Sequence, residues 1–152
     1  MFCRYAFLPG AAKSDADLSI LVTHCNPYEM QMEVIMVNAR EILNDFVNGV
    51  GKLSETNGDF IEKFVAVDSS AGTASGAISD KTKELIGVAL GVYNRCQYCI
   101  CVHTHGAYQA GCTREEILGA AEVAIAFGGG PSVAYSAAVL NAALDEFEHD
   151  FD

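Results

Sequence analysis

The chain has 152 residues, of which 51% are hydrophobic and 19% are charged, a composition typical of one globular domain with a buried core. Its formal net charge of -11 argues against binding to nucleic acid or to an anionic membrane surface, because both need clusters of Lys and Arg. No apolar run approaches the roughly 18 residues that a membrane-spanning helix needs. We read no signal peptide at the N-terminus, so we expect a cytoplasmic protein with no membrane partner.

The pattern of the chain predicts one domain preceded by an extension. Residues 1–27 show no readable periodicity, and we interpret them as an N-terminal extension. Residues 28–152 carry helical signals throughout and no strand alternation of any length. The predicted fold is therefore all-α, with about six helices in a single domain.

The first half of this domain predicts two helices and a loop. Apolar residues recur three and four positions apart over 28–48, which is typical of an amphipathic helix. We expect this helix to stop near Gly49 and Gly51, because glycine is a common helix stop signal. A shorter helix is predicted over 58–70, and the Gly- and Ser-rich residues 69–77 predict a loop where it ends.

The central region predicts two consecutive helices. Ser79 has the side chain of an N-cap for a helix over 80–92, since its hydroxyl can accept a hydrogen bond from a free backbone N–H. Asn94 is the next candidate cap, at the start of a helix over 95–110. Gly111 suits the left-handed position at which helices often end.

Two further helices complete the predicted fold. Thr113 and Glu116 have the spacing of a capping box, which predicts a helix over 114–127. Three glycines and a proline then break the helix, and a last helix rich in small residues follows over 131–147. The acidic residues 145–152 are expected to be solvated and frayed.

Four chemically active side chains lie within twenty residues in the middle of the chain. Cys96 and Cys99 are three positions apart, His103 follows four positions later, and Glu84 stands twelve positions before Cys96. On a helix, residues three and four apart share a face, so the two thiols and the imidazole form one stripe. If the preceding helix folds back in a tight hairpin, the Glu84 carboxylate can orient His103 or relay a proton.

This combination of side chains is typical of thiol redox chemistry. Only the thiolate is a nucleophile, and a helix N-terminus or a nearby imidazole raises the thiolate fraction of a cysteine. The helix N-terminus favours Cys96 as the more acidic thiol, whereas His103 lies next to Cys99. A second thiol converts an oxidised sulfur to a disulfide before the sulfur is oxidised further.

The spacing Glu84-x11-Cys96-x2-Cys99-x3-His103 resembles the signature of a known family. It is similar to the alkylhydroperoxidase D-like branch of the carboxymuconolactone decarboxylase superfamily. The resemblance extends over about residues 55–130, covers the last helix loosely and does not cover the N-terminal extension. It implies an alkylhydroperoxidase D-like all-helical fold, a homo-oligomer (commonly a trimer or hexamer) and thiol-dependent reduction of a small hydroperoxide.

The resemblance also implies a role for each side chain. Cys99 would attack the peroxide, and Cys96 would resolve the oxidised sulfur. His103 and Glu84 would form the proton relay. No cofactor is implied beyond the redox-active disulfide Cys96–Cys99, and a dithiol carrier such as a lipoyl domain would reduce it again.

Other functions stay open on the sequence alone. A decarboxylase-type lyase would use His103 and Glu84 for proton transfer, although decarboxylase members generally lack the cysteine pair. A non-enzymatic helical oligomer that senses redox state or metal is a further alternative. We predict no metal site. Zinc-type ligands are present at Cys96, Cys99, Cys101, His103 and His105, but Cys101 and His105 point away from the stripe of the other three, and a closed zinc site usually draws a second ligand pair from elsewhere.

The remaining candidate side chains have more ordinary interpretations. Cys101 lies off the Cys96–Cys99 stripe and is expected to pack in the core. His105 lies on the other side of its helix from His103 and is expected at the surface or an interface. Tyr98 either lines the pocket or packs as an ordinary aromatic. The other cysteines are expected to be spectators: Cys3, Cys25 and Cys112.

Overall fold

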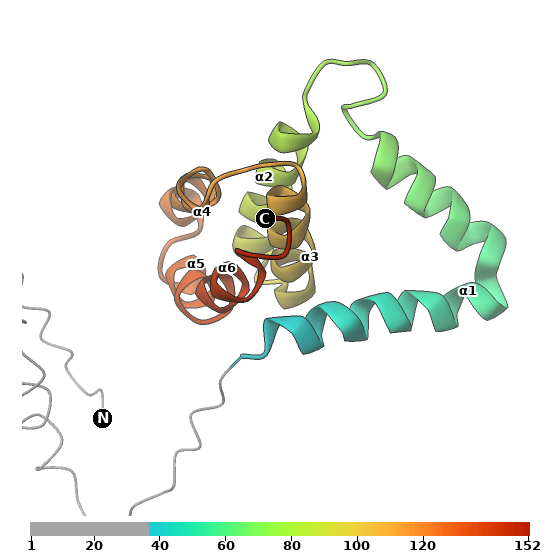
Figure 1. Ribbon diagram of the computed structural model, residues 1–152, viewed down its shortest axis with the longest axis horizontal. Coiled ribbons are helices and arrows are strands. Elements are labelled where there is room, and N and C mark those ends of the chain that lie inside the picture. Colours follow the sequence, from blue (N-terminus) through green and yellow to red (C-terminus); the bar gives the residue numbers. More distant parts are fainter. Residues whose placement is uncertain (1–36) are drawn as a thin grey trace, which may run out of the picture. The chain divides into compact units, whose positions relative to one another are not determined.

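The computed structural model describes residues 37–152, and every regular element in this range is helical (Figure 1). The elements are α1 (Ala39–Ser70), α2 (Asp80–Asn94), α3 (Gln97–Gln109), α4 (Arg114–Gly128), α5 (Gly130–Tyr135), the π-helical turn η1 (Ser136–Leu140) and α6 (Asn141–Phe147). The all-α prediction is confirmed for this part of the chain. The predicted extension over 1–27, with Cys3 and Cys25, lies outside the described residues.

Helix α1 differs from the prediction in where it breaks. It continues through Gly49 and Gly51, and its one non-helical residue is Asn57, with φ −128° and ψ 36°. An isolated glycine is tolerated inside a helix at a cost of about 1 kcal/mol. Asn57 lies between Thr56 and Gly58, but residues 48–51 contain equally weak helix formers, so helix propensity alone does not explain why the break lies at Asn57. The segment after Asn57 matches the helix predicted over 58–70.

Helices α2 and α4 begin at the predicted caps. The Ser79 hydroxyl accepts the Thr82 backbone N–H at 3.1 Å. At the start of α4, Glu116 N–H donates to Thr113 Oγ1 at 3.3 Å while Thr113 N–H donates to Glu116 Oε2 at 2.8 Å. This reciprocal capping box also lowers the pKa of Glu116, because the carboxylate accepts a backbone hydrogen bond.

The predicted last helix is one continuous rod in three parts. Gly129, with φ +64°, ends α4, and α5 starts at once with Pro131 in its first turn. Within the rod, the Asn141 N–H donates to the Ser136 carbonyl, five residues back, and this bond closes the π-helical turn η1 before α6. The Ser136 hydroxyl at this turn is buried and has no hydrogen-bond partner among the described residues.

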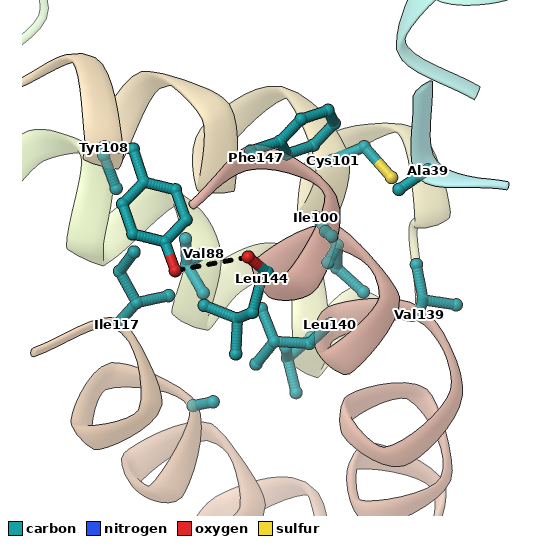
Figure 2. Packing of buried hydrophobic residues seen from close by; sticks show 14 of the residues in the cluster. Ala39, Val88, Ile100, Cys101, Tyr108, Ile117, Val139, Leu140, Leu144 and Phe147 are labelled. Carbon is teal, nitrogen blue, oxygen red and sulfur yellow. Dashed lines mark hydrogen bonds between the residues drawn. The ribbon is translucent and has the colours of Figure 1, made fainter. Parts of the chain in front are cut away.

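The core lies between α3 and the helices around it. Helix α2 packs against α3 and α4, and α3 packs against α6 and α1. Figure 2 shows Tyr108 of α3 donating its hydroxyl to the Leu144 carbonyl of α6, at 3.4 Å. The largest fully buried side chains are Phe147, Ile100, Ile117, Leu140, Leu144, Val88 and Val92. No helix within residues 37–152 is both long and apolar enough to cross a membrane.

Phe147 docks the C-terminal segment against the core, which corrects the prediction of a frayed tail at this residue, while the other residues of 145–152 are exposed as expected. Phe147 is fully buried. The guanidinium of Arg40, at the start of α1, lies 4.8 Å from the centroid of the Phe147 ring. Arg40 also forms ion pairs with Glu146 at 2.9 Å and Asp150 at 2.8 Å. The acidic side chains are exposed, as their composition indicates, and the Phe147 ring and the Arg40 ion pairs hold the segment against the core.

Candidate active site

The site is built on a tight turn between α2 and α3. The Arg95 N–H donates to the Val92 carbonyl at 3.2 Å, and the Cys96 N–H donates to the Gly91 carbonyl at 3.0 Å. These two bonds form a Schellman motif, which requires a left-handed residue at its corner. Arg95 fills that position with φ 58°, and it is the one non-glycine residue with positive φ among residues 37–152. The turn reverses the chain at once, so α2 and α3 pack as an antiparallel hairpin.

Cys96 is the N-cap of α3, which corrects the prediction that Asn94 caps this helix. Asn94 is the last residue of α2, because the Schellman turn leaves no room for a separate cap. The Cys96 Sγ accepts the Cys99 backbone N–H at 3.2 Å, in the place of the usual cap oxygen. A sulfur at this position lies among the unpaired N–H groups of the first turn, which favour a thiolate.

The two cysteines form a disulfide across the first turn of α3. The sulfurs of Cys96 and Cys99 are bonded, and the Cα atoms are 5.3 Å apart. Both residues are half-buried. The sulfur pair therefore lies at the N-terminal end of α3, where a reactant can reach it, and not in the apolar interior.

Glu84 and His103 form the second half of the site. The Nδ1 atom of His103 is 2.8 Å from Oε2 of Glu84, and the two side chains are 23% and 18% exposed. A neutral imidazole that donates its Nδ1–H to a carboxylate keeps the lone pair on Nε2 free to accept a proton. His103 also lies one turn after Cys99 on α3, so the hairpin brings all four predicted residues into one region.

The two helices approach each other closely at Gly91, a residue that the sequence reasoning did not single out. A Cβ atom on Gly91 would lie 3.0 Å from the Ile100 nitrogen and 3.2 Å from the Cys99 carbonyl carbon. Glycine at this position therefore admits the first turn of α3 against the backbone of α2. The available signal was the pair of glycines four positions apart, Gly87 and Gly91, on one face of the predicted helix.

His105 belongs to a different cluster. Its ring makes edge contacts with Phe147 and Phe151, with centroids 5.3 Å and 4.9 Å apart, and its Nε2 is 3.5 Å from Asp150 Oδ2. Burial lowers the pKa of His105, although Asp150 favours the charged form. The side chain is 29% exposed, and it packs from α3 against the C-terminal segment of the same chain.

The two free cysteines of the described region lie in the core. Cys101 is fully buried, as expected, and burial raises its pKa to about 11. Cys112 is also buried, and burial raises its pKa too. Neither thiol is therefore a ready nucleophile. Tyr98 is 41% exposed, so it is not a core aromatic.

The described residues do not assemble a metal centre. No group of three or more His, Cys, Asp or Glu side chains within 37–152 is arranged to hold a metal ion. What the hairpin brings together is a dithiol–disulfide pair and an acid–base pair. Such a combination can exchange electrons at sulfur and move protons beside it.

This chain is a helical protein whose hairpin carries a cysteine pair and a histidine–carboxylate pair, and these features define its class. Sequence comparison places the chain more closely: the model of the carboxymuconolactone decarboxylase family matches residues 58–142, and the chain belongs to this family. The family includes enzymes of decarboxylase and peroxidase-like type.

Relatives and a solved structure agree with this assignment. An uncharacterized protein in the cox locus of Paracoccus denitrificans is 34% identical over 99 residues, which cover 65% of this chain and 87% of the relative. An uncharacterized protein of Cupriavidus necator is 37% identical over 70 residues, covering 46% of this chain and 62% of the relative. The crystal structure of an apo carboxymuconolactone decarboxylase family protein from Legionella pneumophila superposes with a TM-score of 0.65 at 35% identity, covering 72% of this chain and 96% of that one.

Proposed function

We propose that the chain is a thiol-dependent peroxidase that reduces small hydroperoxides with Cys99 and Cys96. The observation that carries the proposal is the combination of a bonded Cys96–Cys99 pair with a His103–Glu84 hydrogen bond of 2.8 Å on the same hairpin. Either half alone is common in proteins, but together they supply both the electrons and the protons that peroxide reduction requires.

The proposed reaction begins with the reduced dithiol. His103 takes the proton of the Cys99 thiol, and Glu84 stabilises the imidazolium that forms. The Cys99 thiolate attacks the terminal oxygen of the hydroperoxide, and the O–O bond breaks. The sulfur becomes a sulfenic acid, and the leaving alkoxide takes the proton from His103 and departs as an alcohol.

The second step closes the disulfide. The Cys96 sulfur attacks the sulfenic sulfur of Cys99, the S–O bond breaks, and the hydroxyl leaves as water with the Cys96 proton. The α3 N-terminus supports this step, because the Cys96 sulfur accepts the Cys99 N–H and so is held near its partner. An external dithiol, such as a reduced lipoyl carrier, then reduces the disulfide by thiol exchange and becomes a disulfide itself.

The proposed partners follow from this chemistry and from the surface. They are a small hydroperoxide, a dithiol reductant and further copies of the chain, and they include no nucleic acid, no membrane and no separate cofactor. Large apolar side chains exposed on α2 and α4 support a homo-oligomer: Ile86, Leu90, Tyr93, Val123 and Phe127. Analytical ultracentrifugation tests this part, and a monomer at micromolar concentration would refute it.

Stopped-flow kinetics test the peroxidase proposal directly. The reduced protein is mixed with cumene hydroperoxide, and thiol loss is followed with time. We expect the wild type and the control Cys101→Ala to lose two thiols per chain rapidly, and Cys99→Ser to react far more slowly. Mass spectrometry should place the new disulfide between Cys96 and Cys99. Thiol loss in Cys99→Ser at the wild-type rate would refute the proposal.

A second candidate is supported by the acid–base pair. The Glu84–His103 hydrogen bond involves neither sulfur, so it would also serve a decarboxylase-type lyase that acts on a lactone-like acid. The double variant Cys96→Ser, Cys99→Ser distinguishes the two. A lyase keeps its turnover in this variant, whereas a dithiol peroxidase loses it.

A further inference from the structure

Two glycines lie directly against the Glu84–His103 pair. A Cβ atom on Gly87 of α2 would overlap Cγ and Nδ1 of the His103 ring and lie 2.8 Å from its Cδ2. A Cβ atom on Gly106 of α3 would lie 2.7 Å from Oε2 and 3.0 Å from Cδ of Glu84. Neither position has room for a methyl group unless the functional side chain moves.

The arrangement is reciprocal between the two helices. Gly87 is three residues after Glu84 on α2, and Gly106 is three residues after His103 on α3. In each helix, the functional side chain and the glycine share a face. Each helix therefore presents bare backbone at the place where the side chain of the other helix lies.

Backbone conformation does not explain these two glycines. The glycines with positive φ in the described residues are Gly72, Gly76, Gly111 and Gly129, and neither Gly87 nor Gly106 is among them. A glycine inside a helix costs about 0.5–1 kcal/mol relative to alanine. The structure thus offers one physical reason for glycine at positions 87 and 106: the absence of a methyl group leaves space for the side chain of the opposite helix.

We infer that Gly87 and Gly106 are positioning residues that hold His103 and Glu84 in hydrogen-bonding register. The consequence for reaction rate rests on the proposed peroxidase function, whereas the consequence for the His103–Glu84 geometry does not. A methyl group at position 87 pushes the imidazole away from α2. The Nδ1 atom then leaves the carboxylate, and the ring no longer has a fixed tautomer for proton transfer.

The two glycines differ in how much they constrain. Gly87 faces a rigid ring whose only freedom is rotation about two side-chain bonds. Gly106 faces the carboxylate at the end of a flexible Glu84 side chain, which has a further bond with which to adjust. We therefore expect Gly87→Ala to disturb the pair more than Gly106→Ala.

The experiment compares Gly87→Ala and Gly106→Ala with Gly119→Ala in the full chain. Gly119 lies within α4, where a Cβ atom would meet nothing within 4 Å, so it controls for the helical effect of the substitution. The first readout is the set of ¹⁵N chemical shifts of the His103 ring, which report the nitrogen that carries the proton. The second is the pH profile of thiol loss with cumene hydroperoxide.

We expect Gly87→Ala to shift the His103 ring signals and to slow thiol loss by about tenfold or more, since misplacement by about 1 Å can cost as much as 100-fold. Gly106→Ala should give the same changes in smaller amount, and Gly119→Ala should give neither. Unchanged His103 shifts and an unchanged pH profile in Gly87→Ala would overturn the inference.

Two further arms keep the test decisive. If Gly87→Ala does not fold, Gly106→Ala carries the test, combined with Glu84→Ala. Without the carboxylate, adding Gly106→Ala should have no further effect on the His103 signals, and an equal effect in both backgrounds would overturn the inference. If the wild type does not react with hydroperoxide, the proposed function fails, and the ¹⁵N shifts alone still decide the role of the glycines.

Discussion

Replacing Phe147 with alanine tests whether the C-terminal segment is a structural part of the domain. The ring is fully buried, contacts the His105 ring at 5.3 Å, and lies under the Arg40 guanidinium at 4.8 Å. Truncation of a buried phenylalanine costs about 3–5 kcal/mol. The loss of the cation–π contact adds up to about 1 kcal/mol, so we expect the free energy of unfolding to fall by about 4 kcal/mol.

Phe151 is the matched control for this substitution. It contacts the same His105 ring at 4.9 Å but is 43% exposed, so Phe151→Ala should cost only about 1 kcal/mol. Urea unfolding followed by circular dichroism measures both variants, and Phe147→Ala should also lower Tm by about 10–20 °C. Equal losses in the two variants would contradict the burial of Phe147 as the ring that anchors the C-terminal segment.

Three further predictions concern the site and its supports. Arg95→Gly should raise the free energy of unfolding by about 1 kcal/mol in urea titrations, because glycine adopts the left-handed turn without strain; a lower stability would contradict the assigned turn. Glu84→Gln should slow thiol loss by about 100-fold with little change in Tm, because the amide cannot stabilise the imidazolium of His103; an unchanged rate would exclude the relay. Burial lowers the pKa of His105, so the unfolded chain binds its proton first and stability should fall as the pH drops through about 6.5. His105→Gln should weaken this dependence between pH 7.5 and 5.5, and an unchanged slope would refute the assignment.

Most of the helices could be predicted from the sequence because the signals for helix starts and ends are local. Ser79, Thr113 and Glu116 cap the helices at the predicted positions, since a cap depends on side chains within three residues of it. The same holds for the spacing of Cys96, Cys99 and His103, which geometry alone places on one side of α3. The residues also suggested Glu84, but its position depends on how tightly the hairpin closes, and the family resemblance supported its place in the site.

The errors came from features that depend on tertiary contacts or on competing local signals. Gly49 and Gly51 carry the composition of a helix end, yet their backbone is helical and the break occurs at Asn57. Phe147 stands in an acidic tail, and only packing against α3 and Arg40 reveals that it is a core residue. The roles of Gly87 and Gly106 were invisible for the same reason, because a missing methyl group matters only once the opposite helix is in place.

The Schellman turn at Arg95 belongs to the part of the domain that holds the site, and the remaining helices can change around this part. Every group assigned to the proposed chemistry lies on the hairpin formed by α2, this turn and α3, and none comes from α1, α4, α5 or α6. Substitutions in those outer helices can reshape the approach to the sulfurs, or the contacts with other molecules, while the reacting atoms keep their spacing. Under the proposed peroxidase function, variation in the outer helices would change which hydroperoxide or dithiol reaches the sulfurs and would leave the reacting atoms in place.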